Sequence, residues 1–121
     1  METLSDVMTR DLVIVAPATT VAGAATLMST RHVGSVLVMD GDRLAGIFTE
    51  RDIVRALAGD FDASGHEVGA WMTSNPVSAA PDTTTSQALE LMLAHGFRHL
   101  PVVDDGRVAG MVSIRDVTPR A

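Results

Sequence analysis

A short phrase with the composition of a nucleotide site occurs twice in this chain. GIFTERD fills residues 46–52, and GMVSIRD fills residues 110–116. Each copy has a hydroxyl three residues before an aspartate: Thr49 with Asp52, and Ser113 with Asp116. At a helix start, such a carboxylate can accept hydrogen bonds from both ribose hydroxyls, while free N–H groups attract a phosphate. The same spacing forms a capping box that only stabilises the helix, so the residues alone leave both interpretations open.

The phrase belongs to a longer internal repeat. Residues 8–57 align with residues 72–121 without a gap, and 17 of the 50 aligned pairs are identical. Each copy is too short to bury a stable core alone, so we predict one globular module built from two halves. The predicted boundaries are residues 1–58 for the first half, 59–69 for the connection and 70–121 for the second half.

Local patterns predict the same elements in both halves. The class is α/β (α+β), in the order β-α-β-β-α. Apolar residues that recur every three or four positions indicate helices, and apolar runs around Asp-Gly turns indicate hairpins. In the second half, Thr84 and Gln87 predict a capping box. The predicted elements are strands at 12–16 and 77–80, helices at 19–31, 83–95 and 49–58, and hairpins at 35–48 and 100–112.

Composition excludes several classes of protein. Nine basic residues against fifteen acidic ones give a net charge of −6, which disfavours binding to a nucleic acid backbone. The longest apolar runs fall short of a membrane span, and the acidic start does not resemble a signal peptide. Cysteine is absent, so disulfides and thiolate chemistry are excluded, and a reducing cytoplasm fits. We therefore expect an acidic, soluble, cytoplasmic protein without nucleic acid or membrane partners.

Metal and catalytic motifs are weak. His95 and His99 have the spacing of a helical metal pair, but Gly96 lies between them where the helix should end. His66 begins a pattern that resembles a zinc protease motif, but Ala70 replaces the second histidine. Serine, histidine and aspartate have no spacing that selects a catalytic triad. We therefore expect no catalytic residue and no metal site.

Taken together, the repeated segments resemble a pair of cystathionine-beta-synthase (CBS) domains, often called a Bateman module. The shared pieces are V-M-T and P-x-T-T at each start, RHLPVVD at residues 98–104, and the repeated G-h-h-[ST]-x-x-D ending, where h is apolar. The resemblance implies a three-stranded sheet with two helices in each half and pseudo-two-fold symmetry between the halves. It also implies two clefts that bind adenosine-type ligands such as AMP, ADP, ATP or S-adenosylmethionine. Such modules regulate an attached or separate protein.

Carried over residue by residue, the resemblance assigns a crosswise set of residues to each cleft. Arg98 and His99 fall where family members often bind phosphate, whereas the first half has Gly34 and Ser35, so we expect the first cleft to be the better phosphate site. The first half also has Leu37 where the family usually has proline. The first cleft comprises Ile47, Thr49, Asp52, Val77, Phe97, Arg98 and His99. The second comprises Val13, Val33, Gly34, Ser35, Met111, Ser113 and Asp116.

Three functional hypotheses follow. The favoured one is a regulatory sensor that needs no cofactor, binds AMP, ATP or S-adenosylmethionine, and modulates an unknown partner protein. The second is a dimeric interaction protein of the same fold with empty clefts. The third is an enzyme, and no catalytic or metal-binding motif in the sequence supports it. We also expect a homodimer, with the small residues Ala22, Gly23, Ala24 and Ala25 of the helix at 20–31 allowing close approach.

Overall fold

The chain folds into two compact units whose boundaries cross those of the sequence repeat. The computed structural model describes residues 1–119. One unit is the continuous segment Val13–Pro76, and the other combines Met1–Leu12 with the chain from Val77 onward. The first twelve residues therefore belong with the second repeat, not with the first.

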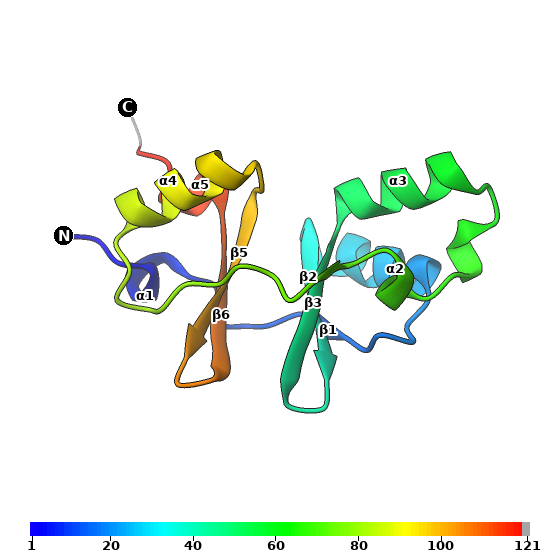
Figure 1. The fold of residues 1–121 in the computed structure, drawn as a ribbon, viewed down its shortest axis with the longest axis horizontal. Coiled ribbons are helices and arrows are strands. Elements are labelled where there is room, and N and C mark those ends of the chain that lie inside the picture. Colours follow the sequence, from blue (N-terminus) through cyan, green and yellow to red (C-terminus); the bar gives the residue numbers. More distant parts are fainter. Residues whose placement is uncertain (120–121) are drawn as a thin grey trace. The chain divides into compact units, whose positions relative to one another are not determined.

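The continuous unit contains a four-stranded sheet flanked by helices (Figure 1). Its strands lie in the order β1-β2-β3-β4, with β1 parallel to β2 and the other neighbours antiparallel. The elements are β1 (Ile14–Val15), α2 (Val21–Arg31), β2 (Ser35–Asp40), β3 (Arg43–Thr49), α3 (Glu50–Gly59) and β4 (Thr73–Ser74). The predicted hairpin and both predicted helices are confirmed.

Local chemistry explains where these elements begin and turn. Thr20 caps α2 by accepting a hydrogen bond from the N–H of Gly23 at 3.0 Å. Gly41 has a φ of 61°, which the tight turn between β2 and β3 requires. The core of this unit is built from small and β-branched residues around Phe48, which is fully buried.

The predicted connection at 59–69 is an ordered part of this unit. It forms two short 3-10 turns, Ala63–Gly65 and Val68–Ala70, and buries Ala63 and Val68. The N–H of Val68 donates to the carbonyl of Thr19 at 2.8 Å. This hydrogen bond links the connecting segment to the residues just before α2.

The second unit repeats this plan in a reduced form. Its hairpin and its long helix match the prediction, and the predicted capping box of Thr84 and Gln87 is present. The strand predicted at 77–80 consists of one parallel bridge between Ala79 and Val102, since serine and alanine offer little side chain to pack on a sheet. The elements are α1 (Leu4–Val7), α4 (Thr85–His95), β5 (His99–Asp104), β6 (Arg107–Ser113) and α5 (Ile114–Val117).

In each unit the sheet is extended by the first residues of the opposite repeat. Thr9 and Met111 exchange two backbone hydrogen bonds, of 2.9 and 3.0 Å, at the edge of β6. Correspondingly, Thr73 of β4 pairs with Ile47 of β3. The predicted fold class is confirmed, but the expectation of three strands per half omitted these added segments.

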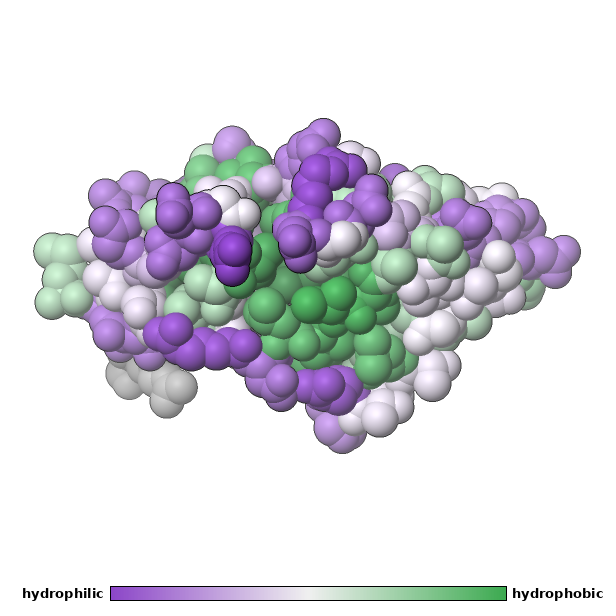
Figure 2. All heavy atoms as spheres, turned by 90° about the horizontal axis from the view of Figure 1, so that it is seen from below, coloured by the Kyte–Doolittle hydropathy of each residue, from purple (hydrophilic) through white to green (hydrophobic). Residues whose placement is uncertain are grey.

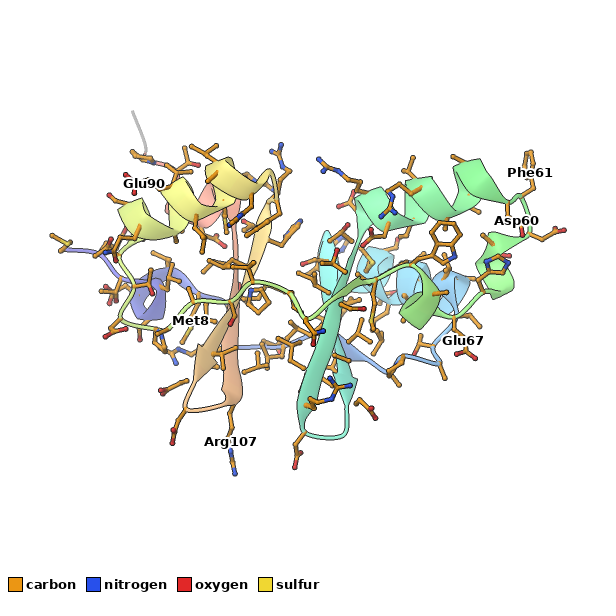
Figure 3. The ribbon with its side chains drawn as sticks, in the orientation of Figure 1. Met8, Asp60, Phe61, Glu67, Glu90 and Arg107 are labelled. Carbon is orange, nitrogen blue, oxygen red and sulfur yellow. The ribbon has the colours of Figure 1, made fainter. Side chains whose placement is uncertain are left out.

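Apolar side chains also reach the surface. Figure 2 shows hydrophobic atoms among hydrophilic ones on the face in view. Phe61, just after α3, is 95% exposed and points away from the ribbon (Figure 3). The other large exposed apolar residues are Met1, Ile14, Val54, Leu57, Val77 and Leu93. Within residues 1–119, no helix is long and apolar enough to cross a membrane.

Candidate functional site

The first repeated phrase forms the junction between β3 and α3. Thr49 is the N-cap of α3, and its hydroxyl accepts a hydrogen bond from the N–H of Asp52 at 3.3 Å. In return, Asp52 Oδ2 accepts from the N–H of Thr49 at 2.9 Å and from its hydroxyl at 3.2 Å. The capping box, one of the two interpretations that the sequence left open, is therefore present. It accounts for both residues without a ligand.

Asp52 is the most deeply buried charged residue of the described chain. Its side chain is 6% exposed, and its Oδ1 accepts a hydrogen bond from the guanidinium of Arg55 at 3.0 Å. Burial of a carboxylate is costly unless it is paired and hydrogen-bonded. Here the backbone, a hydroxyl and a guanidinium together satisfy that condition.

Two predicted residues of the other cleft adjoin this junction. Ser35, which is buried, pairs with Thr49 across the β2–β3 ladder. The carbonyl of Gly34 accepts from the N–H of Glu50 at 3.1 Å. This end of the continuous unit therefore brings together Gly34 and Ser35 with Thr49 and Asp52.

Three apolar members of the predicted sets line the same unit. Ile47 is buried on β3 opposite Leu37. The carbonyl of Val13 accepts from the N–H of Leu37 at 3.0 Å, and Val13 belongs to the core. Val33 is partly buried against that core. Ile47 and Val13 are buried, so most of their side-chain surface already contacts other residues of the chain.

The second repeated phrase forms the junction between β6 and α5. Asp116 Oδ2 accepts from the N–H of Ser113 at 2.7 Å and from its hydroxyl at 3.2 Å. Here the aspartate is exposed and has no ion pair with a described residue. The two aspartates thus share a cap but differ in accessibility.

The predicted phosphate-binding residues adjoin this second junction. His99 pairs with Ser113 across the β5–β6 ladder, and the carbonyl of Arg98 accepts from the N–H of Ile114 at 2.8 Å. Phe97 packs partly buried against the core of this unit, and its ring stacks on that of His95 at 5.6 Å. The backbones of Arg98 and His99 therefore lie beside the junction that carries Asp116, within one unit.

The remaining predicted residues of this unit lie on its strands and at its edge. Met111 pairs with Pro101 in the β5–β6 ladder, and Val77 is 43% exposed. Each of the two predicted clefts combines residues from both compact units. The structure brings together the members that share a unit, and the crosswise pairing remains a prediction.

A third hydroxyl–aspartate pair lies outside the repeat and was missed from the sequence. Thr3 and Asp6 form a capping box at α1, with Asp6 Oδ2 accepting from the N–H of Thr3 at 2.9 Å. The hydrogen bonds from the backbone and hydroxyl of Thr3 lower the pKa of Asp6. The segment TLSD carries the same spacing, which could have revealed it. Hydroxyl–aspartate spacing alone therefore marks helix starts in this chain, and a ligand site needs further support.

His66, in the connecting segment, forms a hydrogen bond and a ring stack with Trp71, the single tryptophan of the chain. Trp71 Nε1 donates to His66 Nδ1 at 3.2 Å, and the rings stack with centroids 6.2 Å apart. On its other side, His66 Nε2 lies 3.2 Å from Asp60 Oδ2. Trp71 also packs, partly buried, against the core of its unit. Nowhere in residues 1–119 do three metal-binding side chains gather into a potential ion site.

Sequence comparison places these features in a known family. The model of the CBS domain matches the chain twice, at residues 4–59 and 67–119. The uncharacterized 17.7 kDa protein of the bps2 3' region of Acidianus ambivalens is 40% identical over 117 residues, covering 94% of this chain and 70% of that protein. The CBS domain-containing protein YhcV of Bacillus subtilis is 32% identical over 97% of this chain and 84% of its own length.

Solved structures give the same result. The CBS-domain protein ATU1752 of Agrobacterium tumefaciens has a TM-score of 0.90 and 40% identity, with 95% of both chains covered. CBSX2 in complex with AMP has a TM-score of 0.84 and 30% identity, covering 97% of this chain and 93% of its own. The CBS domain pair of MJ0100, in complex with 5′-methylthioadenosine and S-adenosyl-L-methionine, has a TM-score of 0.87, 25% identity and the same two coverages. This chain belongs to the CBS domain family and carries two CBS domains in tandem.

Proposed function

We propose that this CBS pair is a regulatory module that binds an adenosine-type ligand and alters the activity of a partner protein. The observation that carries the proposal is the similarity to two CBS pairs solved with such ligands. One holds AMP, and the other holds 5′-methylthioadenosine and S-adenosyl-L-methionine. The similarity covers 97% of this chain in both cases.

The proposed ribose contacts are the two repeated aspartates. A carboxylate can accept hydrogen bonds from both hydroxyls of a ribose, and both aspartates lie at the start of a helix. The apolar members of the predicted sets would contact the adenine. Arg98 and His99 would contact a phosphate, since a cationic donor forms charge-assisted hydrogen bonds with phosphate oxygens. The ligand residues of the two sets, as assigned from the resemblance, form part of this proposal.

Calorimetric titration tests the proposal. Purified protein is titrated with AMP, ATP, 5′-methylthioadenosine and S-adenosylmethionine, and its melting temperature is measured with each. A ligand that binds only the folded chain raises the melting temperature. Asp52→Asn and Asp116→Asn should each weaken binding at one site by about tenfold or more, since each weakens a charge-assisted bond. Absence of binding by all four ligands would overturn the proposal.

A second hypothesis is an interaction module with the same fold and no ligand. The observation in its favour is that the hydroxyls and carboxylates of both phrases are already satisfied by capping bonds. Under this hypothesis, Asp52→Asn would reduce stability and no nucleotide would change the melting temperature. The same titrations therefore separate the two functions.

The partners and location belong to the proposal as well. We expect a homodimer that forms through α2. Ala24 is buried in the core of its own unit and is therefore not available for this contact. Ala22 and Gly23 are exposed and Ala25 is half-buried, so these three residues can contribute to it. Light scattering at micromolar concentration tests the dimer, and a mass of 12.7 kDa would contradict it. The regulated protein is unidentified, and the cysteine-free composition fits a cytoplasmic setting.

A further inference from the structure

The hydrogen-bonding capacity of Asp52 is almost fully used within the chain. An ionised carboxylate offers about four acceptor positions. The N–H and hydroxyl of Thr49 occupy two on Oδ2, and the guanidinium of Arg55 occupies one on Oδ1. A ribose diol brings two hydroxyl donors. Since the side chain is 6% exposed, the diol cannot gain two bonds unless an existing donor leaves.

Arg55 is the donor best able to leave. The N–H of Thr49 is part of the backbone, and its hydroxyl is held by accepting from the N–H of Asp52. By contrast, the Arg55 side chain is 59% exposed and can turn into water. Exposed arginines pair weakly because solvent screens the charge and the long side chain loses conformational freedom. The Arg55 guanidinium therefore occupies Asp52 Oδ1 in the free protein, and this ion pair is weak enough to be broken by a ligand.

The second repeat lacks this arrangement. The gap-free alignment places Pro119 opposite Arg55, and proline has no donor to offer. Asp116 accordingly keeps its bonds to Ser113 and pairs with no described basic side chain. The arginine contact distinguishes the two otherwise similar junctions.

We propose that Arg55 is an internal competitor that occupies Asp52 and lowers the affinity of the first CBS domain for a ribose. The inference rests on the proposed adenosine-binding function. Binding at Asp52 then requires the guanidinium to swing away, and ligand binding releases Arg55 into solvent. A released arginine in the middle of α3 would give a partner protein a surface difference between the free and bound states.

The test is a gain of affinity. Arg55→Met keeps the aliphatic stem and removes the competing donor. Titration with 5′-methylthioadenosine, which has no phosphate, should show binding about two- to fivefold tighter than in the wild type, within the range expected for an exposed ion pair. Arg43→Met is the matched control, because it removes the exposed Arg43–Asp40 contact of the hairpin and should leave affinity unchanged. Arg55→Leu, which also has no donor, is a second variant if Arg55→Met fails to fold.

Two further measurements locate the effect. In an Asp52→Asn background, Arg55→Met should produce no gain, since the carboxylate is the shared partner. Added sodium chloride screens the Arg55–Asp52 pair, so it should tighten the binding of uncharged 5′-methylthioadenosine in the wild type and not in Arg55→Met.

The outcomes separate this inference from the proposed function. Tighter binding by Arg55→Met, including binding where the wild type shows none, supports the inference. If the wild type binds and Arg55→Met binds equally or more weakly, Arg55 is no competitor and the inference is overturned while the function stands. If neither protein binds AMP, ATP, 5′-methylthioadenosine or S-adenosylmethionine, the proposed function fails and the inference fails with it.

Discussion

The sulfur of Met72 lies 2.5 Å from the position that a Cβ atom on Gly46 would occupy. The carbonyl oxygen of Thr73 is 2.7 Å from the same position. Gly110 has the equivalent relationship with Met8 and Thr9, at 2.6 and 3.0 Å, and Figure 3 shows Met8 beside β6. Because the glycine that begins each repeated phrase has no side chain, it leaves room for the strand segment that packs against it. Its role is explained by packing, independently of any ligand.

Gly46→Ala should destabilise the protein. The Thr73 carbonyl belongs to the β3–β4 pairing and cannot retreat easily, so the new methyl group must displace backbone. Overpacking of this kind costs about 1–3 kcal/mol in the free energy of unfolding. Urea denaturation measures it. Gly65→Ala is the control, because no atom lies within 4 Å of its Cβ position, and equal stability of the two variants would refute the explanation.

Leu4→Ala should loosen the second repeat, although Leu4 precedes the first. Leu4 is fully buried in the core that contains Met92 and Leu100. A cavity at such a site costs about 2–5 kcal/mol. Hydrogen exchange should therefore accelerate more in α4, β5 and β6 than in β2 and β3. Val36→Ala, in the core of the continuous unit, should give the opposite pattern. The same pattern for both variants would contradict the division into units.

Asp6→Asn should lower the melting temperature at neutral pH and have no effect in acid. Hydrogen bonds from Thr3 lower the pKa of Asp6 below its usual 3.8, so the folded state favours the charged carboxylate. That stabilisation is complete above the unfolded pKa and is lost as pH falls through the lower folded value. Melting temperatures of both proteins between pH 2 and pH 7 check this. A difference that persists below both pKa values would mean that charge is not the cause.

His66→Ala should expose and reorient the only tryptophan. Trp71 would lose its acceptor and the stacked ring, leaving a partly buried N–H unsatisfied at a cost of about 1–3 kcal/mol. The emission of Trp71 should shift to longer wavelength as water reaches the indole. His66→Asn, whose amide oxygen can accept in place of Nδ1, should retain more of the native spectrum. Identical spectra for wild type and His66→Ala would show that the contact does not form in solution.

Local sequence determined most of the secondary structure. Thr49 and Thr84 cap helices where the spacing indicated a capping box, because a cap depends on residues three positions apart. The Asp-Gly turns likewise placed both hairpins, since a tight turn selects residues that accept a positive φ. The repeat, the family and the two phrases follow from the same local patterns.

Tertiary structure decided which segment completes which sheet. Met8-Thr9 and Met72-Thr73 are identical in sequence, so no local signal tells that Thr9 pairs with Met111 and Thr73 with Ile47. It also decided that Asp52 is buried and paired while Asp116 is exposed. Both phrases carry the same hydroxyl and carboxylate, and the difference comes from packing and from Arg55. Long-range pairing and burial depend on the whole chain, and for that reason neither could be predicted from the repeated phrase alone.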